Sequence, residues 1–142
     1  MKGCAVLFVI LTSLCIAGCN SKPSLVGDWS GNLGVSNVTL DMSFHFNQDG
    51  TVSVSQSAGG MGSTQKGTYK EDEKEKTVTI TATSMESPSI PKAQLDKINE
   101  LLAKQPQTAT FDLEWKDSDT IAIKQRGARP PLDSHITLKR KK

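Results

Sequence analysis

Only a few residues in this 142-residue chain are of types that commonly do chemistry in proteins. His45 and His135 lie far apart in the chain, and His45 falls on the polar face of an alternating segment, as surface histidines do. No second histidine stands at ligand spacing, and no cysteine follows Cys19, so the visible motifs assemble neither a zinc nor a copper site. The serines form no Gly-x-Ser-x-Gly motif and stand beside no evident base. The sequence therefore predicts a protein that is not an enzyme and uses no metal or cofactor.

The remaining chemistry is at Cys19, which follows an N-terminal segment with the features of a signal peptide. Lys2 is a short basic region, and an apolar run over 5–11 resumes at Leu14, too short to span a bilayer comfortably. The motif Ile-Ala-Gly-Cys that ends at Cys19 resembles the lipobox of bacterial lipoproteins. That resemblance implies removal of residues 1–18 and acylation of the Cys19 thiol. An ordinary secretory signal cut elsewhere, or an uncleaved anchor, is the alternative.

The same resemblance implies a cellular location for the mature chain, which would be held to a membrane through its N-terminal acyl chains. Two or three such chains give nearly permanent attachment, since each buried methylene contributes about 0.8 kcal/mol. Residues 19–24 would form a short lipidated tether that keeps the domain close to the bilayer. We expect a bacterial cell envelope lipoprotein. Because Asn20 rather than Asp follows the cysteine, we expect the outer membrane, facing the periplasm, if the host is Gram-negative.

Composition and charge limit the number of domains, the kinds of partner and the fold class of the mature chain. Without residues 1–18 it has 124 residues, enough for one domain, with 16 basic and 15 acidic side chains. A net charge of +1 gives no reason to expect a nucleic-acid partner. All three cysteines lie at or before Cys19, so the mature fold has no disulfide. The low apolar content favours a β-rich domain over residues 25–140.

Alternating apolar and polar residues predict eight half-buried strands. The clearest alternation runs from Val38 to Phe46, followed by an Asp-Gly turn at Asp49 and Gly50. A loose glycine-rich loop is expected over 57–63, and only a short fourth strand over 67–70. Between the fifth and sixth strands, helical spacing predicts one amphipathic helix that begins with Pro91 and ends before Pro106. Its apolar stripe is expected to cover the open end or a flank of the strands, and consists of Leu95, Ile98, Leu101 and Leu102.

Short connections between these strands favour an up-and-down barrel over a sandwich, because sequential hairpins close naturally and leave no free edge. The Gly27-Asp28-Trp29 motif then resembles the Gly-x-Trp signature of lipocalin and other calycin barrels. The segments FHFNQDGTVSV and ITLKRK are similar to strands of small bacterial lipocalin-like lipoproteins. The resemblance implies that Trp29 packs across the closed end, with Lys139 or Arg140 over its ring. The helix lies elsewhere than in that family, and no Arg-x-Tyr pair for a ligand carboxylate is seen.

An eight-stranded barrel is just wide enough to be filled by its own side chains or to hold one small ligand. Six aromatic side chains are expected to face inward and are candidates either for core packing or for lining a ligand cavity. They are Trp29, Phe44, Phe46, Tyr69, Phe111 and Trp115. The leading hypothesis is a barrel that binds a small apolar molecule or lipid. The alternative is a filled barrel that serves as an envelope protein-interaction, inhibitor or assembly module.

Two exposed basic segments could contact a partner or anionic head groups. Arg126 and Arg129 lie in a stiff loop that runs to Pro131, and four basic residues over 139–142 end the chain. Solvated positions without a partner are the alternative for both segments.

Overall fold

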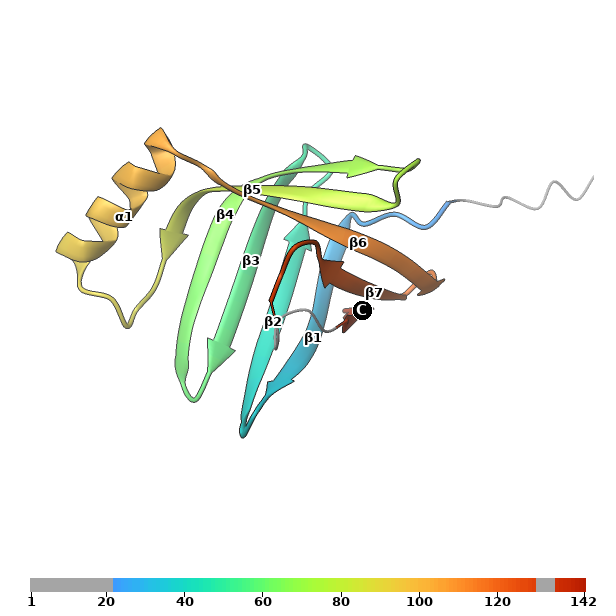
Figure 1. Ribbon diagram of the computed structural model, residues 1–142, viewed down its shortest axis with the longest axis horizontal. Coiled ribbons are helices and arrows are strands. Elements are labelled where there is room, and N and C mark those ends of the chain that lie inside the picture. Colours follow the sequence, from blue (N-terminus) through green and yellow to red (C-terminus); the bar gives the residue numbers. More distant parts are fainter. Residues whose placement is uncertain (1–21, 130–134) are drawn as a thin grey trace, which may run out of the picture.

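The computed structural model describes residues 22–129 and 135–142, which form one closed barrel of eight strands and one helix (Figure 1). Residues 1–18, Cys19 and the first part of the predicted tether lie outside the described residues, as do Pro130 and Pro131. The elements are β1 (Gly27–Val35), β2 (Val38–Phe46), β3 (Thr51–Ala58), β4 (Met61–Asp72), β5 (Thr77–Glu86), α1 (Lys92–Lys104), β6 (Gln107–Asp117), β7 (Thr120–Gln125) and β8 (Ile136–Arg140).

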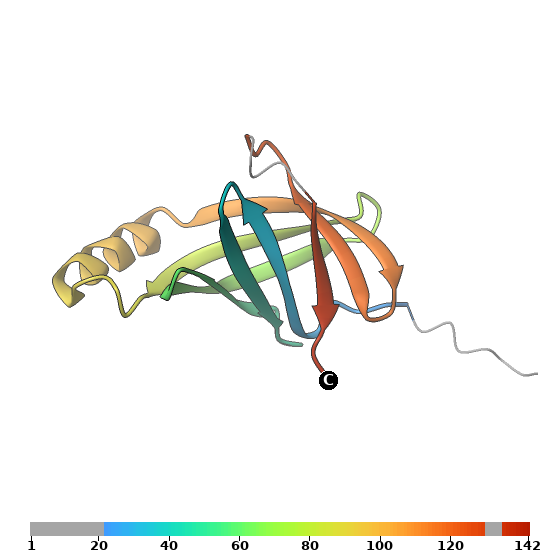
Figure 2. The ribbon, with the colours of Figure 1, turned by 90° about the horizontal axis from the view of Figure 1, so that it is seen from below.

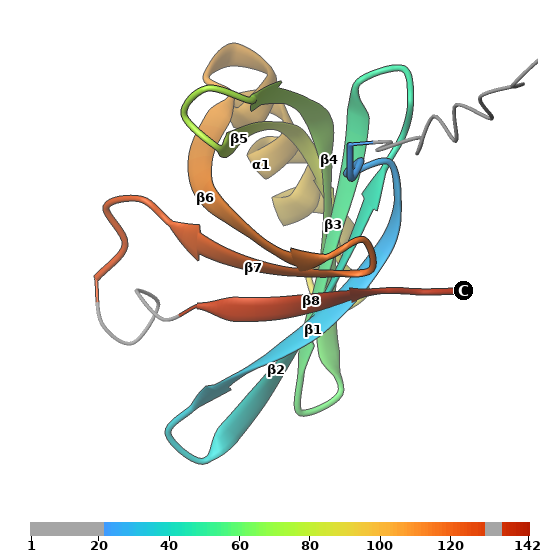
Figure 3. The same ribbon diagram turned by 90° about the vertical axis from the view of Figure 1, so that its right-hand side faces the viewer.

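Each strand pairs antiparallel with the next in sequence, and β8 pairs with β1 to close the barrel (Figure 3). The closing register joins Trp29 to Arg140 and Ser30 to Lys139. The predicted architecture, an eight-stranded up-and-down barrel with a helix between the fifth and sixth strands, is confirmed. Closure satisfies the backbone groups of both terminal strands where they meet, which an open sheet would leave at its edges.

The barrel has two different ends. At one end, β1 begins after residues 22–26, which we call the strap, and the β2–β3, β4–β5 and β6–β7 turns lie at this same strap end. The opposite end, which we call the open end, carries the β1–β2 and β3–β4 turns and the connections to α1. Figure 2 shows α1 at the left and the strap at the right, at opposite ends of the barrel.

The predicted loop over 57–63 is wrong, because β3 and β4 form one continuous hairpin. Ala58 pairs with Met61 around a two-residue turn, in which Gly59 and Gly60 have φ of 58° and 81°. Positive φ at both positions is typical of the tight turns that match the twist of a hairpin. The first part of β4 escaped prediction because residues 62–65 are Gly, Ser, Thr and Gln, whereas the backbone ladder needs no apolar side chain to form.

The fourth strand is accordingly much longer than the predicted 67–70 and contains an irregularity between Lys66 and Gly67. A Cβ atom at Gly67 would lie 1.8 Å from the carbonyl oxygen of Thr81 on β5. Only glycine allows the two backbones to approach this closely. Gly67 therefore permits the local bulge that bends β4 around the barrel.

Helix α1 lies against the last part of β5 and extends away from the barrel (Figure 1). The Asn99 amide accepts a hydrogen bond from the Met85 backbone N–H (2.6 Å) and donates one to its carbonyl (3.0 Å). Asn99 thus substitutes for a neighbouring strand, because β6 pairs with β5 only as far as Ala82. Leu102 is buried, but Leu101 remains 66% exposed, so the stripe covers a flank and only in part. Within the described ranges, no helix is long and apolar enough to cross a membrane.

Candidate functional site

The strap end of the barrel is filled around Trp29, whose side chain is fully buried. The indole Nε1 donates a hydrogen bond of 2.7 Å to the carbonyl of Leu25, which is itself buried. The guanidinium of Arg140 lies over the same ring, with Cζ 4.3 Å from the ring centroid. Lys139 or Arg140 was expected over this ring, and the residue that lies there is Arg140. The strap, the first strand and the last strand therefore meet at one tryptophan.

Arg140 also makes polar contacts on three sides. Its guanidinium donates hydrogen bonds of 2.7 Å to the carbonyls of Ser24 and Val26, and one of 3.3 Å to Ser118. Its Nε lies 3.2 Å from a carboxylate oxygen of Asp119. The planar guanidinium suits such divergent acceptors, which a lysine could not reach together. Arg140 therefore holds the strap against the β6–β7 turn.

The six predicted inward aromatics are all buried or packed against the core, and they form two groups. The two tryptophans, Trp29 and Trp115, meet edge to face at 5.7 Å between ring centroids. In the other group, Phe46 contacts Tyr69 at 4.9 Å, and Phe44 contacts Phe46 at 5.9 Å and Phe111 at 6.5 Å. Such ring contacts fill the strap half of the barrel with side chains, as the alternative hypothesis expected.

The open half of the barrel contains a cavity of about 420 Å³, which we call the interior cavity. Its apolar wall includes Phe44 and Phe111, so two of the six candidate aromatics line it, whereas Trp29, Phe46, Tyr69 and Trp115 do not. The other lining residues come from β2 to β7 and are Met42, Val54, Gln56, Gln65, Ile80, Ala82, Gln107, Thr108, Ala109 and Gln125. The interior is therefore divided into a packed half and a hollow half.

Several of these lining residues escaped the sequence prediction although a signal was present. Gln56 continues the inward parity of Val52 and Val54, and Gln125 continues that of Ile121 and Ile123. A polar residue that breaks an apolar alternation near the end of a strand marks the level at which the packed core stops. The inward glutamines in the sequence therefore mark the open end of the barrel.

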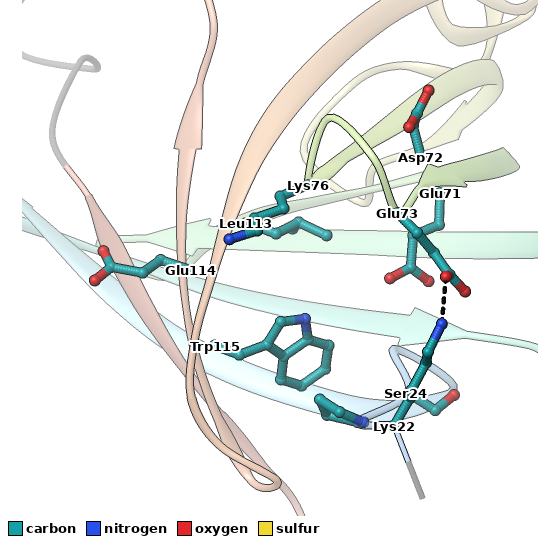
Figure 4. Close-up of a pocket in the computed structure, with 10 residues that line it drawn as sticks. Lys22, Ser24, Glu71, Asp72, Glu73, Lys76, Leu113, Glu114 and Trp115 are labelled. Carbon is teal, nitrogen blue, oxygen red and sulfur yellow. Dashed lines mark hydrogen bonds and ion pairs between the residues drawn. The ribbon is translucent and has the colours of Figure 1, made fainter.

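A second hollow, of about 570 Å³, lies at the strap end between the strap and the β4–β5 turn (Figure 4). Trp115 and Leu113 line it, and Lys22 spans it through an ion pair of 2.7 Å with Glu73. Burial, and then the charge of Glu73, raises the pKa of Glu71 in the same wall. Although this hollow is larger, its charged walls would have to lose water to admit an apolar molecule. The interior cavity is the better site for such a ligand.

The candidate surface residues have partners within the chain or stand exposed. Arg126 Nε donates a hydrogen bond of 2.7 Å to a carboxylate oxygen of Asp112, and Arg129 is exposed. Four basic residues end the chain, among which Lys141 lies 3.4 Å from the Ser43 hydroxyl and Lys142 lies 3.8 Å from Asp119.

The two histidines are both exposed, as expected for surface positions. His45 pairs through Nδ1 with the carboxylate of Asp28, which raises the pKa of the imidazole. Among residues 22–129 and 135–142, no group of three or more His, Cys, Asp or Glu side chains could hold a metal ion.

The fold and the site together define a class of protein: a closed eight-stranded antiparallel barrel, compatible with a lipocalin-like fold, with a hollow open half. In comparisons with known proteins, the sequence matches no protein-family model and no curated protein.

Proposed function

We propose that the barrel binds a small apolar molecule or lipid in its interior cavity and performs no catalysis. The observation that carries this proposal is the division of the interior, in which aromatic packing ends at Phe44 and Phe111 and a cavity begins. Its volume of about 420 Å³ lies within the roughly 300–1,000 Å³ of small-molecule sites. Met42, Val54 and Ile80 add apolar surface around those two rings. Such a wall favours an apolar ligand through the hydrophobic effect.

We further propose that the protein is a lipocalin-like lipoprotein of the bacterial envelope, anchored through acyl chains on Cys19. The contacts of the strap support a definite orientation on the membrane. Lys22 and Ser24 are held at the strap end by Glu73 and Arg140. Lys22 lies three positions after Cys19 in the chain, a reach of at most about 11 Å. The strap end would then face the lipid surface, and the interior cavity would open away from it.

A second candidate function, an envelope protein-interaction or assembly module, is favoured by exposed apolar side chains at the open end. Val38, Met61 and Leu101 are 52%, 67% and 66% exposed, and all three belong to this end of the barrel. Apolar side chains left exposed at one end of a fold can contribute to a contact surface. On this hypothesis their replacement by serine abolishes partner cross-linking and leaves ligand content unchanged.

The deciding experiment is native mass spectrometry of the protein released gently from its own membranes. We expect a stoichiometric mass beyond the polypeptide and its N-terminal acyl chains. Ala109→Trp places a large ring in the interior cavity and is expected to remove that mass. Thr39→Trp places the same ring on an exposed position of β2 and is expected to retain it. If the wild type shows only the mass of the polypeptide and its N-terminal acyl chains under several growth conditions, the carrier hypothesis is overturned.

A further inference from the structure

Four glutamines from four different strands line the interior cavity. Gln56 lies on β3, Gln65 on β4, Gln107 on β6 and Gln125 on β7. They occur together with apolar residues, and apart from Thr108 they are the polar side chains of the cavity wall. The cavity thus combines an apolar wall around Phe44 and Phe111 with a set of amides from across the barrel.

Within the part of the chain that the structure describes, the hydrogen-bonding capacity of these amides is unused. Throughout the described ranges, none of the four side chains makes a hydrogen bond to another protein group. None of their polar atoms is both buried and unpartnered, so all four are reachable from the cavity or from solvent. Each side-chain amide offers two donors and one carbonyl acceptor. A ligand group at this level can therefore exchange water for several amide partners at little desolvation cost.

Among residues 22–129 and 135–142, no charged side chain belongs to the cavity wall. Arg126 follows Gln125 directly, but its guanidinium pairs with Asp112, which alternates with the inward residues Phe111 and Leu113 and so faces outward. A carboxylate or ammonium group placed among the glutamines would lose hydration without gaining an opposite charge. The wall therefore discriminates against ionised head groups, while it accepts neutral ones.

We propose that the interior cavity selects uncharged amphiphiles, with an apolar chain packed against Phe44 and Phe111 and a neutral hydroxyl, ester or amide head among the glutamines. This inference rests on the proposed function, since it names the class of molecule that the same cavity takes. It excludes free fatty acids and alkyl amines as preferred ligands at neutral pH.

The test is isothermal titration calorimetry of the mature protein, purified free of ligand, with four probes that each have an eight-carbon chain. These are octanol, monooctanoylglycerol, octanoate and octylammonium at neutral pH. We expect the two neutral probes to bind more than about tenfold tighter than either ion. Equal or tighter binding of octanoate or octylammonium would overturn the selection while leaving the carrier function intact. Absence of binding by all four probes would contradict the carrier function as well.

Variants test whether the glutamine amides, rather than packing in the cavity, determine the affinities. The double change Gln65→Leu with Gln125→Leu keeps side-chain size and is expected to weaken monooctanoylglycerol by about tenfold, with octanol affected less because it makes fewer hydrogen bonds. Gln48→Leu, in the exposed β2–β3 turn, is the matched control and should leave all affinities unchanged. Gln125→Arg supplies a cation, and we expect this variant to bind octanoate more tightly than the wild type does. If the double change leaves the affinity for monooctanoylglycerol unaltered, the glutamines do not select the head group.

Discussion

The guanidinium of Arg140 on the last strand lies 4.3 Å from the centre of the Trp29 indole on the first strand, and it also binds the carbonyls of Ser24 and Val26. One side chain thus connects both ends of the chain at the closure of the barrel. The backbone reinforces this contact, since the Lys141 N–H donates a hydrogen bond of 2.8 Å to the carbonyl of Asp28. These contacts join the strap, the first strand and the last strand at one end, while the interior cavity lies in the other half of the barrel.

Replacement of Arg140 should destabilise the domain more than replacement of its neighbour. Arg140→Gln removes the cation over Trp29 together with the hydrogen bonds to the strap, and we expect a loss of about 1–3 kcal/mol in the free energy of unfolding. Lys139→Gln, at an exposed position one residue earlier, should change it by less than about 0.5 kcal/mol. Urea denaturation of the chain without residues 1–18 measures both. Equal effects of the two changes would show that the Trp29 contact contributes little.

The bulge in β4 predicts a strong difference between two glycines. Gly67→Ala would place a Cβ 1.8 Å from the Thr81 carbonyl oxygen, so β4 and β5 would have to separate. We expect a loss of about 1–3 kcal/mol in the free energy of unfolding. Gly34→Ala, in β1, meets no atom within 4 Å and should be neutral or slightly stabilising. Thermal denaturation followed by circular dichroism compares them, and a harmless Gly67→Ala would mean that the two strands are not so close.

His45 and Asp28 predict a small dependence of stability on pH. The hydrogen bond and charge of Asp28 raise the pKa of His45 above its ordinary value of 6.5 in the folded protein. The stabilisation is therefore fully present below pH 6.5 and is lost as the pH rises through the folded pKa. The pair is exposed, so the effect is small. We expect the melting temperature of the wild type minus that of Asp28→Asn to decrease as the pH rises from about 5.5 to about 8.

An NMR titration checks the same pair directly. The pKa of His45 should be lower in Asp28→Asn than in the wild type, because the hydrogen-bonded carboxylate is gone. An unchanged imidazole pKa would show that the two side chains do not interact in solution.

Membrane attachment is expected to depend on one cysteine. Cys19→Ser removes the thiol that the lipobox resemblance designates for acylation, so the protein should be released from the membrane fraction by carbonate washing. Cys15→Ser changes a cysteine inside the predicted leader and should leave attachment intact, because that residue is removed with the leader. If Cys19→Ser protein resists the carbonate wash, its anchor is not a lipid at this residue.

Much of the fold could be predicted because it depends on local patterns. The alternation from Val38 to Phe46 determines which face of β2 is buried, and Phe44 and Phe46 are indeed among the most buried side chains. Helical spacing between two prolines likewise determined α1. The tight β3–β4 turn and the first part of β4 escaped because residues 59–65 are mostly Gly, Ser, Thr and Gln, for which periodicity of hydrophobicity carries no signal.

Tertiary structure alone decided how the barrel interior is used. The sequence determined which side chains face inward, since parity along a strand settles that. Whether inward side chains meet depends on distances across the barrel, between strands far apart in the chain. Phe46 reaches Tyr69 and Trp29 reaches Trp115, so the strap half is filled. Toward the open end, Ala82, Ala109 and the glutamines do not fill the space between the walls, and a cavity remains.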